Sequence, residues 1–167
     1  MESGTYPHAA LDSPEDGCET ASMRADDREP EPPGEAPLDA LFAAARAARE
    51  RAHAPYSRFK VGAALSDEQG RVHAGCNVEN AAYPVGTCAE AGAIAAMVAA
   101  GGTRIRAILV LGEGDGPVTP CGACRQRIRE FAESATPVHA AGLDGILASF
   151  TLEALLPASF GPETLGG

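Results

Sequence analysis

The sequence predicts an α/β fold: a three-layer α/β/α sandwich around a mixed sheet of roughly five strands. Two observations carry this prediction. Short, strand-like apolar segments alternate along the chain with segments of helical periodicity. The 167 residues are enough for one domain and too few for two of ordinary size. The sequence contains no internal repeat and no Gly-rich phosphate loop.

The first half of the expected domain contains a helix, a hairpin and a second helix. Residues 38–52 repeat apolar side chains at helical spacing and are rich in alanine. The Ala-Pro pair at 54–55 ends this helix, because a residue before proline avoids the α region. Residues 58–80 predict two strands joined by a polar turn at 67–70. The second helix starts near Cys88, and a pair of glycines stops it.

The second half alternates strands with helices. Residues 105–113 form a short, β-branched apolar run bounded by glycines, which predicts a buried strand. A helix is expected at about 121–133, with Pro120 suited to its first turn. Residues 136–142 and 146–151 are weaker strand candidates, and a last short helix follows them.

Charge divides the chain into an acidic tail and a nearly neutral domain. Residues 1–36 hold ten acidic and two basic residues, whereas residues 37–167 hold thirteen and eleven. The tail is rich in Pro, Glu, Asp and Gly, a composition that cannot bury enough apolar surface to offset its ordering entropy. We therefore predict a disordered tail over 1–36 and one folded domain over 37–167. The domain lacks the basic excess that nucleic-acid binding needs.

The N-terminal residues and the cysteines bear on location. The first residues lack the basic and apolar regions of a signal peptide, and no apolar run reaches the length of a membrane span. We therefore expect a cytoplasmic protein with no membrane partner. An odd number of cysteines in a reducing compartment indicates metal binding or reactive thiols rather than disulfides. They are Cys18, Cys76, Cys88, Cys121 and Cys124.

The strongest local signal is Cys121-Gly-Ala-Cys124 at one predicted helix start, together with Cys88-Ala-Glu90 at another. Three thiolates and one water give the open tetrahedron of catalytic zinc, so these three cysteines predict a site for one zinc ion. Cys76 could add a fourth thiolate, although it lies in a predicted strand. No histidine lies near either motif. Helix N-termini favour thiolates and offset their negative charge.

Glu90 follows Cys88 by two residues, which would place its carboxylate near the metal but not necessarily on it. Zinc lowers the pKa of a bound water, and a carboxylate there can take the proton and later return it. A C-x-x-C pair alone is often structural zinc, a redox pair or chance. The pairing of Pro-Cys-x-x-Cys with an upstream Cys-x-Glu is far more specific and is typical of zinc deaminases.

Six blocks of the sequence resemble the small homotetrameric cytidine deaminases. They occur in the family's order, at 55–65 (PYSRFKVGAAL), 75–80 (GCNVEN), 83–84 (YP), 88–90 (CAE), 120–126 (PCGACRQ) and 155–162 (LLPASFGP). The resemblance implies a cytidine deaminase-like catalytic domain over 37–167 and a homotetramer. It also implies zinc ligation by Cys88, Cys121 and Cys124, with Glu90 as the proton shuttle.

The same resemblance implies a set of substrate contacts. Asn77 and Glu79 match the pair that holds the ribose hydroxyls, a role that an amide and a carboxylate suit chemically. Phe59 matches the aromatic on the pyrimidine ring; without its sequence block, core packing would be the better interpretation. The remaining matches are backbone groups near Ala89 and Thr119 at the base edge, and the aromatics Tyr56 and Phe160, some of which neighbouring subunits supply in the family.

One position departs from the family pattern. Many members have arginine directly after Cys-Ala-Glu, where it is thought to offset the charge of the thiolates, and this chain has Ala91 there. Arg127 follows Cys124 by three residues and would therefore share its helix face. It could compensate for the missing arginine, or it could be a solvated surface residue.

The resemblance implies zinc-dependent hydrolysis of cytidine to uridine and ammonia in pyrimidine salvage, with 2′-deoxycytidine as a second substrate. A closely related alternative is deamination of another aminopyrimidine nucleoside, such as blasticidin S, which Ala91 leaves open. A non-catalytic zinc scaffold is a further alternative, although a scaffold has no need of Glu90. Polynucleotide editing is disfavoured, because the domain has no basic excess and no single-strand channel of arginines and aromatics.

Overall fold

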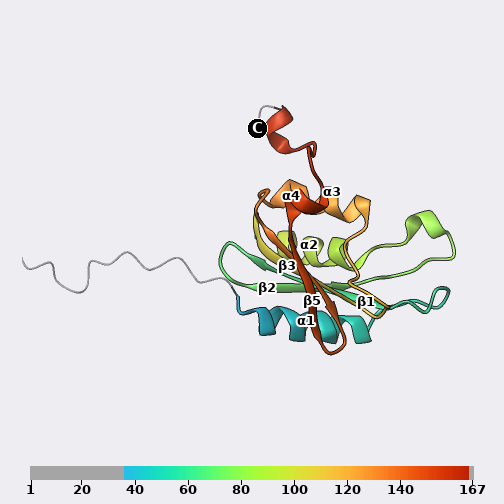
Figure 1. The fold of residues 1–167 in the computed structure, drawn as a ribbon. Coiled ribbons are helices and arrows are strands. Elements are labelled where there is room, and N and C mark those ends of the chain that lie inside the picture. Colours follow the sequence, from blue (N-terminus) through green and yellow to red (C-terminus); the bar gives the residue numbers. More distant parts are fainter. Residues whose placement is uncertain (1–35, 166–167) are drawn as a thin grey trace, which may run out of the picture. The chain divides into compact units, whose positions relative to one another are not determined.

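The computed structural model describes residues 36–165, which form three layers (Figure 1). A central five-stranded sheet is covered on one face by helix α1 (Leu38–Glu50). The opposite face carries α2 (Ala89–Ala99) and α3 (Gly122–Phe131), with the short α4 (Leu152–Leu155) beside them. The predicted three-layer α/β class is confirmed. The disordered tail was expected over 1–36, and its residues 1–35 lie outside the described residues.

The sheet is mixed, in the order β2-β1-β3-β4-β5. Three of its four neighbouring strand pairs are antiparallel, and only β3 and β4 run parallel. The strands are β1 (Val61–Asp67), β2 (Val72–Cys76), β3 (Ile105–Gly112), β4 (Pro137–Gly142) and β5 (Gly145–Thr151). The pairing order could not be read from the sequence, which predicted the segments alone.

The register brings three strand ends to one edge of the sheet. Gly62 pairs with Cys76 on one side, and Val61 pairs with Gly112 on the other. The start of β1 therefore lies between the end of β2 and the end of β3. The chain leaves β2 toward α2 and leaves β3 toward α3, so both helices begin near this edge.

Alternating side chains of the central strands fill two separate cores. Leu65 of β1 and Val110 of β3 belong to the cluster under α2 and α3, which also contains Met97. The adjacent Leu109 faces the other way, into the cluster that contains Leu41 of α1. This period of two is what a strand buried on both faces requires.

Two strand glycines permit helices to approach the sheet closely. A Cβ built on Gly62 would lie 2.0 Å from the carbonyl oxygen of Ala45 in α1. One built on Gly75 of β2 would lie 2.4 Å from the amide nitrogen of Ala93 and 2.5 Å from the carbonyl oxygen of Ala89. Because the obstructing atoms are helix backbone, no side-chain rotation could relieve either contact.

The helix boundaries follow the sequence predictions with one correction. The first helix ends at Glu50, two residues before the expected end, and α2 begins directly after its N-cap residue, Cys88. Pro120 was expected in the first turn of α3, and this prediction is wrong. Cys121 occupies the N-cap and the helix begins at Gly122. None of the helices in the described chain combines the length and the apolar character that a membrane crossing requires.

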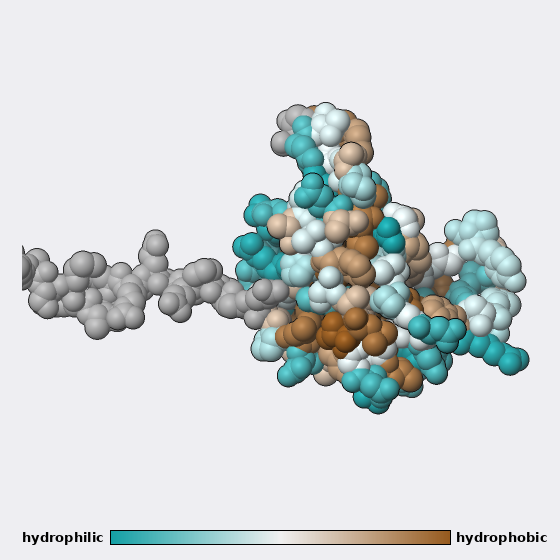
Figure 2. Space-filling model, viewed as in Figure 1, coloured by the Kyte–Doolittle hydropathy of each residue, from teal (hydrophilic) through white to brown (hydrophobic). Residues whose placement is uncertain are grey.

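Apolar surface is exposed on the edge strand β5. Figure 2 shows apolar side chains gathered where β5 passes α1, and Ile146 and Leu147 of this strand are exposed. Tyr83 and Val85 of the short 3₁₀ helix (Tyr83–Val85) and Phe160 are exposed as well. The single chain therefore leaves several large apolar side chains in contact with solvent.

A buried carboxylate fastens the β1–β2 hairpin. Asp67 is fully buried, and its carboxylate accepts hydrogen bonds from Arg71 Nε and from His73 Nε2, each at 2.7 Å. Burial alone would raise the pKa of Asp67, but hydrogen bonds from His73, Arg71 and the Gln69 backbone lower it to about 2. Arg71 also donates to the carbonyl oxygen of Ala100, which ties the hairpin to the end of α2.

We expect the free energy of unfolding to fall as the pH drops from about 4 toward 2. The pKa of Asp67 is lower in the folded protein than its ordinary value of 3.8, so the charged carboxylate stabilises the fold above pH 4 and loses this effect as pH falls through 2. Asp67→Asn should cost about 1–3 kcal/mol at pH 7 by leaving buried donors poorly paired. Urea unfolding from pH 2 to 7 measures both. A pH dependence as steep in the variant as in the wild type would contradict this account.

Gly75→Ala should destabilise the protein by about 1–3 kcal/mol, because the added methyl group meets the backbone of α2. Urea unfolding gives the value. Gly116→Ala is the matched control, since no atom lies within 4 Å of a Cβ at that position, and its change should stay within about 0.5 kcal/mol. Equal stability of the two variants would mean that β2 and α2 can separate freely.

Candidate active site

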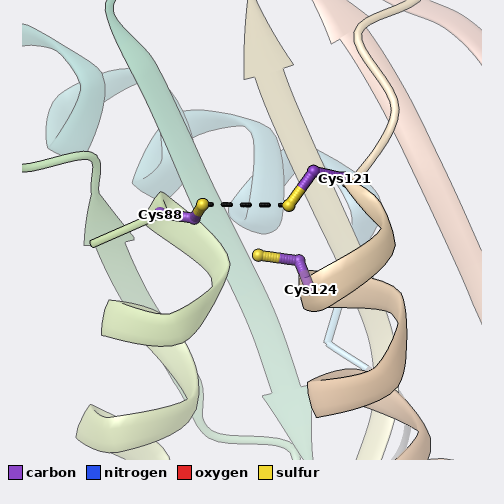
Figure 3. Close-up of side chains that lie close together, drawn as sticks. All are labelled: Cys88, Cys121 and Cys124. Atoms are coloured by element: carbon purple, nitrogen blue, oxygen red, sulfur yellow. Dashed lines mark hydrogen bonds between the residues drawn. The ribbon is translucent and has the colours of Figure 1, made fainter. Parts of the chain in front are cut away.

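Three cysteine side chains converge between the N-termini of two helices (Figure 3). Cys88 is the N-cap residue of α2, Cys121 is the N-cap of α3, and Cys124 lies in the first turn of α3. All three Sγ atoms lie within 4.8 Å of one another, and those of Cys88 and Cys121 are 3.9 Å apart. The structure thus brings together the three cysteines that the sequence predicted.

The thiols experience opposing influences on their ionisation. Burial raises the pKa of Cys124 and of Cys88, and the negative charge of Glu90 raises both further. Partial burial acts the same way on Cys121, but hydrogen bonds from the Cys124 backbone N–H and from the neighbouring thiols lower its pKa overall. Binding of a divalent metal here must therefore displace protons from Cys88 and Cys124.

The donor set fits an open zinc site. Among residues 36–165, only Cys88, Cys121 and Cys124 form a group of three or more potential ligands. Cys76 is outside this group and is a free thiol, so the structure does not supply the fourth thiolate that a closed site would require. Three soft sulfur ligands favour zinc over magnesium or calcium.

Glu90 lies beside the thiols without joining them. It is the second residue of α2 and only 4% exposed. Its negative charge acts on all three thiols, yet its carboxylate is not part of the ligand group. The carboxylate therefore remains available for proton transfer next to the candidate metal.

Cys88, Cys121 and Glu90 line a cavity of about 310 Å³. It contains most of the predicted substrate contacts. Its lining residues include Ser57, Phe59, Val61, Asn77, Glu79, Cys88, Ala89, Glu90, Val110, Val118, Thr119 and Cys121. A volume of this order suits a ligand of small-molecule size.

Asn77 joins the segments on either side of Lys60. Its Oδ1 accepts the backbone N–H of Val61 at 2.8 Å, and its Nδ2 donates to the carbonyl oxygen of Phe59 at 2.9 Å. The amide therefore holds Phe59 at the cavity wall. One Nδ2 hydrogen and one Oδ1 lone pair are left for a ligand.

Glu79 orders the neighbouring loop in a similar way. Its Oε2 accepts the backbone N–H of Tyr56 at 2.8 Å, and its Oε1 accepts the hydroxyl of Ser57. The Ser57 hydroxyl in turn accepts the backbone N–H of Phe59 at 3.0 Å. Hydrogen bonds from Ser57 lower the pKa of Glu79, which is thus held as a carboxylate. Sequence reasoning gave Ser57 no role, although the quoted PYSRFKVGAAL block contains it.

The cleft continues past Glu79 into a second cavity of about 530 Å³. Ser57, Asn77, Glu79 and Cys88 line both cavities. The predicted aromatic Tyr56 lies in the second one, with its ring centroid 5.9 Å from that of Tyr83. Tyr83 was quoted in a family block but assigned no role.

Arg125 is a positioning residue that sequence reasoning missed. Its guanidinium donates to the carbonyl oxygens of Pro120 and Leu155, each at 2.8 Å, and to the hydroxyl of Thr119 at 3.1 Å. It therefore fixes the loop that carries Thr119 and Cys121. Its position directly after Cys124 was the available signal.

Phe160 lies apart from the other predicted contacts. Its carbonyl oxygen accepts a hydrogen bond from Gln126 Nε2 at 2.9 Å, which fastens the C-terminal segment to α3. The side chain is 56% exposed and lines neither of the two cavities. Within one chain, the structure does not bring Phe160 to the thiols.

A cluster of three cysteines at two helix N-termini, with an adjacent buried carboxylate and an aromatic-lined cavity, defines a zinc-dependent hydrolase of the deaminase class. Comparisons with known proteins agree. Residues 37–140 match a family model described as the cytidine and deoxycytidylate deaminase zinc-binding region. The chain belongs to this family.

Relatives support the assignment over most of the described domain. A cytidine deaminase of Sporosarcina psychrophila is 44% identical over 128 residues, covering 77% of this chain and 94% of the relative. A crystal structure of cytidine deaminase from Burkholderia pseudomallei, 46% identical, superposes with a TM-score of 0.71 and covers 74% of this chain and 99% of its own. A crystal structure of a mutant cytidine deaminase from Mycobacterium tuberculosis is 35% identical and gives a TM-score of 0.68. It covers 76% of this chain and 100% of its own.

The purified protein should contain one zinc per chain. Cys124→Ala should weaken zinc binding more than about 100-fold, because losing even a residue that only hydrogen-bonds a metal ligand typically lowers metal affinity about 10–100-fold. Chelator competition and elemental analysis measure the loss. Cys76→Ala is the matched control, because its thiol lies outside the cluster. Zinc retained equally in both variants would place the metal elsewhere.

Proposed function

We propose that the protein catalyses the hydrolytic deamination of cytidine to uridine and ammonia in pyrimidine salvage, with 2′-deoxycytidine as a second substrate. One observation carries the proposal: two of the three clustered thiols, Cys88 and Cys121, border the same cavity as Glu90 and the Phe59–Asn77–Glu79 group. Relatives named cytidine deaminase, at 41–44% identity over most of the domain, support the choice of substrate.

The reaction requires a nucleophile, a proton shuttle and a leaving group. Cys88, Cys121 and Cys124 would hold the zinc, which lowers the pKa of a water and polarises it. Glu90 takes one proton from the attacking water and delivers it to N3 of the ring as oxygen adds to C4. It then moves the proton of the new C4 hydroxyl to the amine. The C4–N4 bond breaks, ammonia leaves, and the C4 carbonyl of uridine remains.

Substrate recognition falls to the rest of the cleft. In the proposal, Phe59 packs on the pyrimidine ring, and backbone groups near Ala89 and Thr119 contact its edge. Asn77 and Glu79 hydrogen-bond the ribose hydroxyls with the donor and acceptor capacity that they retain. Their fixed positions support this, because recognition groups held by backbone hydrogen bonds need little ordering when the ligand binds.

We further propose that the active form is a homotetramer located in the cytoplasm, where free thiols persist. Exposed apolar side chains at Tyr83, Val85 and Phe160 support self-association. Tyr56 and Phe160 would then contribute to the cleft of a neighbouring subunit as well as to their own chain. Mass measurement in solution tests the oligomeric state.

Glu90→Gln should lower kcat on cytidine by about 10²–10⁴-fold, because the amide can neither accept nor return the proton. The decrease in ultraviolet absorbance as cytidine becomes uridine gives the rate. Zinc content should remain one per chain, since Glu90 is not in the ligand group.

Glu153→Gln is the matched control, with the same change on an exposed carboxylate of α4 that should leave turnover unaltered. A zinc-loaded wild-type protein that left cytidine unchanged would contradict the proposal. Turnover of blasticidin S in the same assay would then identify another aminopyrimidine as the substrate, and no turnover of either would indicate a zinc scaffold.

A further inference from the structure

With a divalent ion bound, the thiol cluster would carry a net negative charge. Three thiolates around the ion would leave a net charge of minus one, and the carboxylate of the buried Glu90 beside them would add another. The two helix N-termini offset part of it. Among the side chains of residues 36–165, one cation contacts a thiol, and it belongs to Arg127.

The contact runs along one face of α3. Arg127 lies three residues after Cys124, and its Nη1 donates to Cys124 Sγ at 3.9 Å. Cys124 is fully buried, so water cannot solvate its sulfur. A buried thiolate without a donor would be costly, and a charged donor is the strongest kind available. Much of the Arg127 side chain is exposed, so this contact is made at the edge of the cluster.

Arg127 lines a space between α2 and α3. This space has a volume of about 430 Å³ and is lined by Ala91, Ile94 and Ala95 of α2 and by Gln126, Arg127, Glu130 and Phe131 of α3. The small side chains of Ala91 and Ala95 leave room there. Glu130 lines the same space, yet among the described residues it forms no ion pair with Arg127. The Arg127 guanidinium contacts the thiol of Cys124 instead.

We propose that Arg127 is a positioning residue of the metal centre: it donates a charged hydrogen bond to Cys124, which stabilises the thiolate and reduces the negative charge around the zinc. Both the affinity of the site for zinc and the ability of the bound zinc to polarise water then depend on Arg127. The part concerning metal affinity is independent of the proposed deamination, and the part concerning turnover rests on it.

Arg127→Met removes the charge and the donor while keeping an unbranched apolar stem like that of arginine, so the exposed face of α3 should remain folded. We expect its zinc affinity to fall about 10–100-fold in chelator competition. Arg127→Lys, which keeps the charge but loses the planar fork, should fall between Arg127→Met and the wild type. Circular dichroism verifies that all variants are folded.

Two further measurements distinguish this role from a merely structural one. In the cobalt-substituted protein, the thiolate-to-cobalt charge-transfer band should shift in Arg127→Met, because the hydrogen bond on sulfur is lost. On cytidine, kcat should fall about 10-fold or more while KM stays within about twofold, since Arg127 does not line the 310 Å³ cavity.

Rescue and control variants complete the test. Ala91→Arg in the Arg127→Met background places a guanidinium in the same inter-helix space from α2 and should recover part of the zinc affinity. Arg104→Met is the matched control, because it removes an equal charge from an exposed ion pair with Glu133. Zinc affinity and a cobalt band unchanged in Arg127→Met, or an equal loss in Arg104→Met, would overturn the proposal. The zinc-affinity and cobalt measurements test the role of Arg127 whether or not cytidine is the substrate.

Discussion

The site depends on the approach of two helix N-termini at one edge of the sheet. Cys88 and Cys121 are both N-cap residues, and their sulfurs meet because the ends of β2 and β3 flank the start of β1. Gly75 lets the first turn of α2 contact β2 directly. The N-cap position puts each of these thiols at the positive end of a helix dipole. Sheet register, rather than local sequence, therefore determines the distance between ligands that are 33 residues apart.

The same edge of the sheet also shapes the substrate side of the cleft. Asn77 follows β2 immediately and holds the backbone on either side of Lys60, while Glu79 holds the loop at Tyr56 and Ser57. These polar side chains thus have two tasks: they fix the position of Phe59, and they keep spare hydrogen-bonding capacity facing the cavity. A change at either position would alter the shape of the cleft together with its chemistry.

Local patterns in the sequence predicted the elements and the ligands well. Apolar periodicity located α1 and β3, and the paired cysteine motifs located the metal cluster, because both signals lie within a few residues. The features that the sequence did not predict all involve contacts between distant segments. The sheet order, the hydrogen bonds of Arg125 to Leu155 and the burial of Asp67 depend on tertiary packing, which no local spacing encodes. Helix α3 begins at Gly122 with Cys121 as its N-cap, which leaves Pro120 before the helix rather than in the expected first turn.

Arg127 illustrates what spacing alone leaves open. An interval of three residues places it on the face of Cys124, but the same interval is compatible with a side chain that points into solvent. The deciding features are the complete burial of the Cys124 sulfur and the small residues of α2 opposite, which the structure alone reveals. The need for a cation follows from the three thiolates and Glu90, whereas its source can be either helix. A position on α2 and a position on α3 border one space, so the charge can be supplied from α3 when α2 carries Ala91.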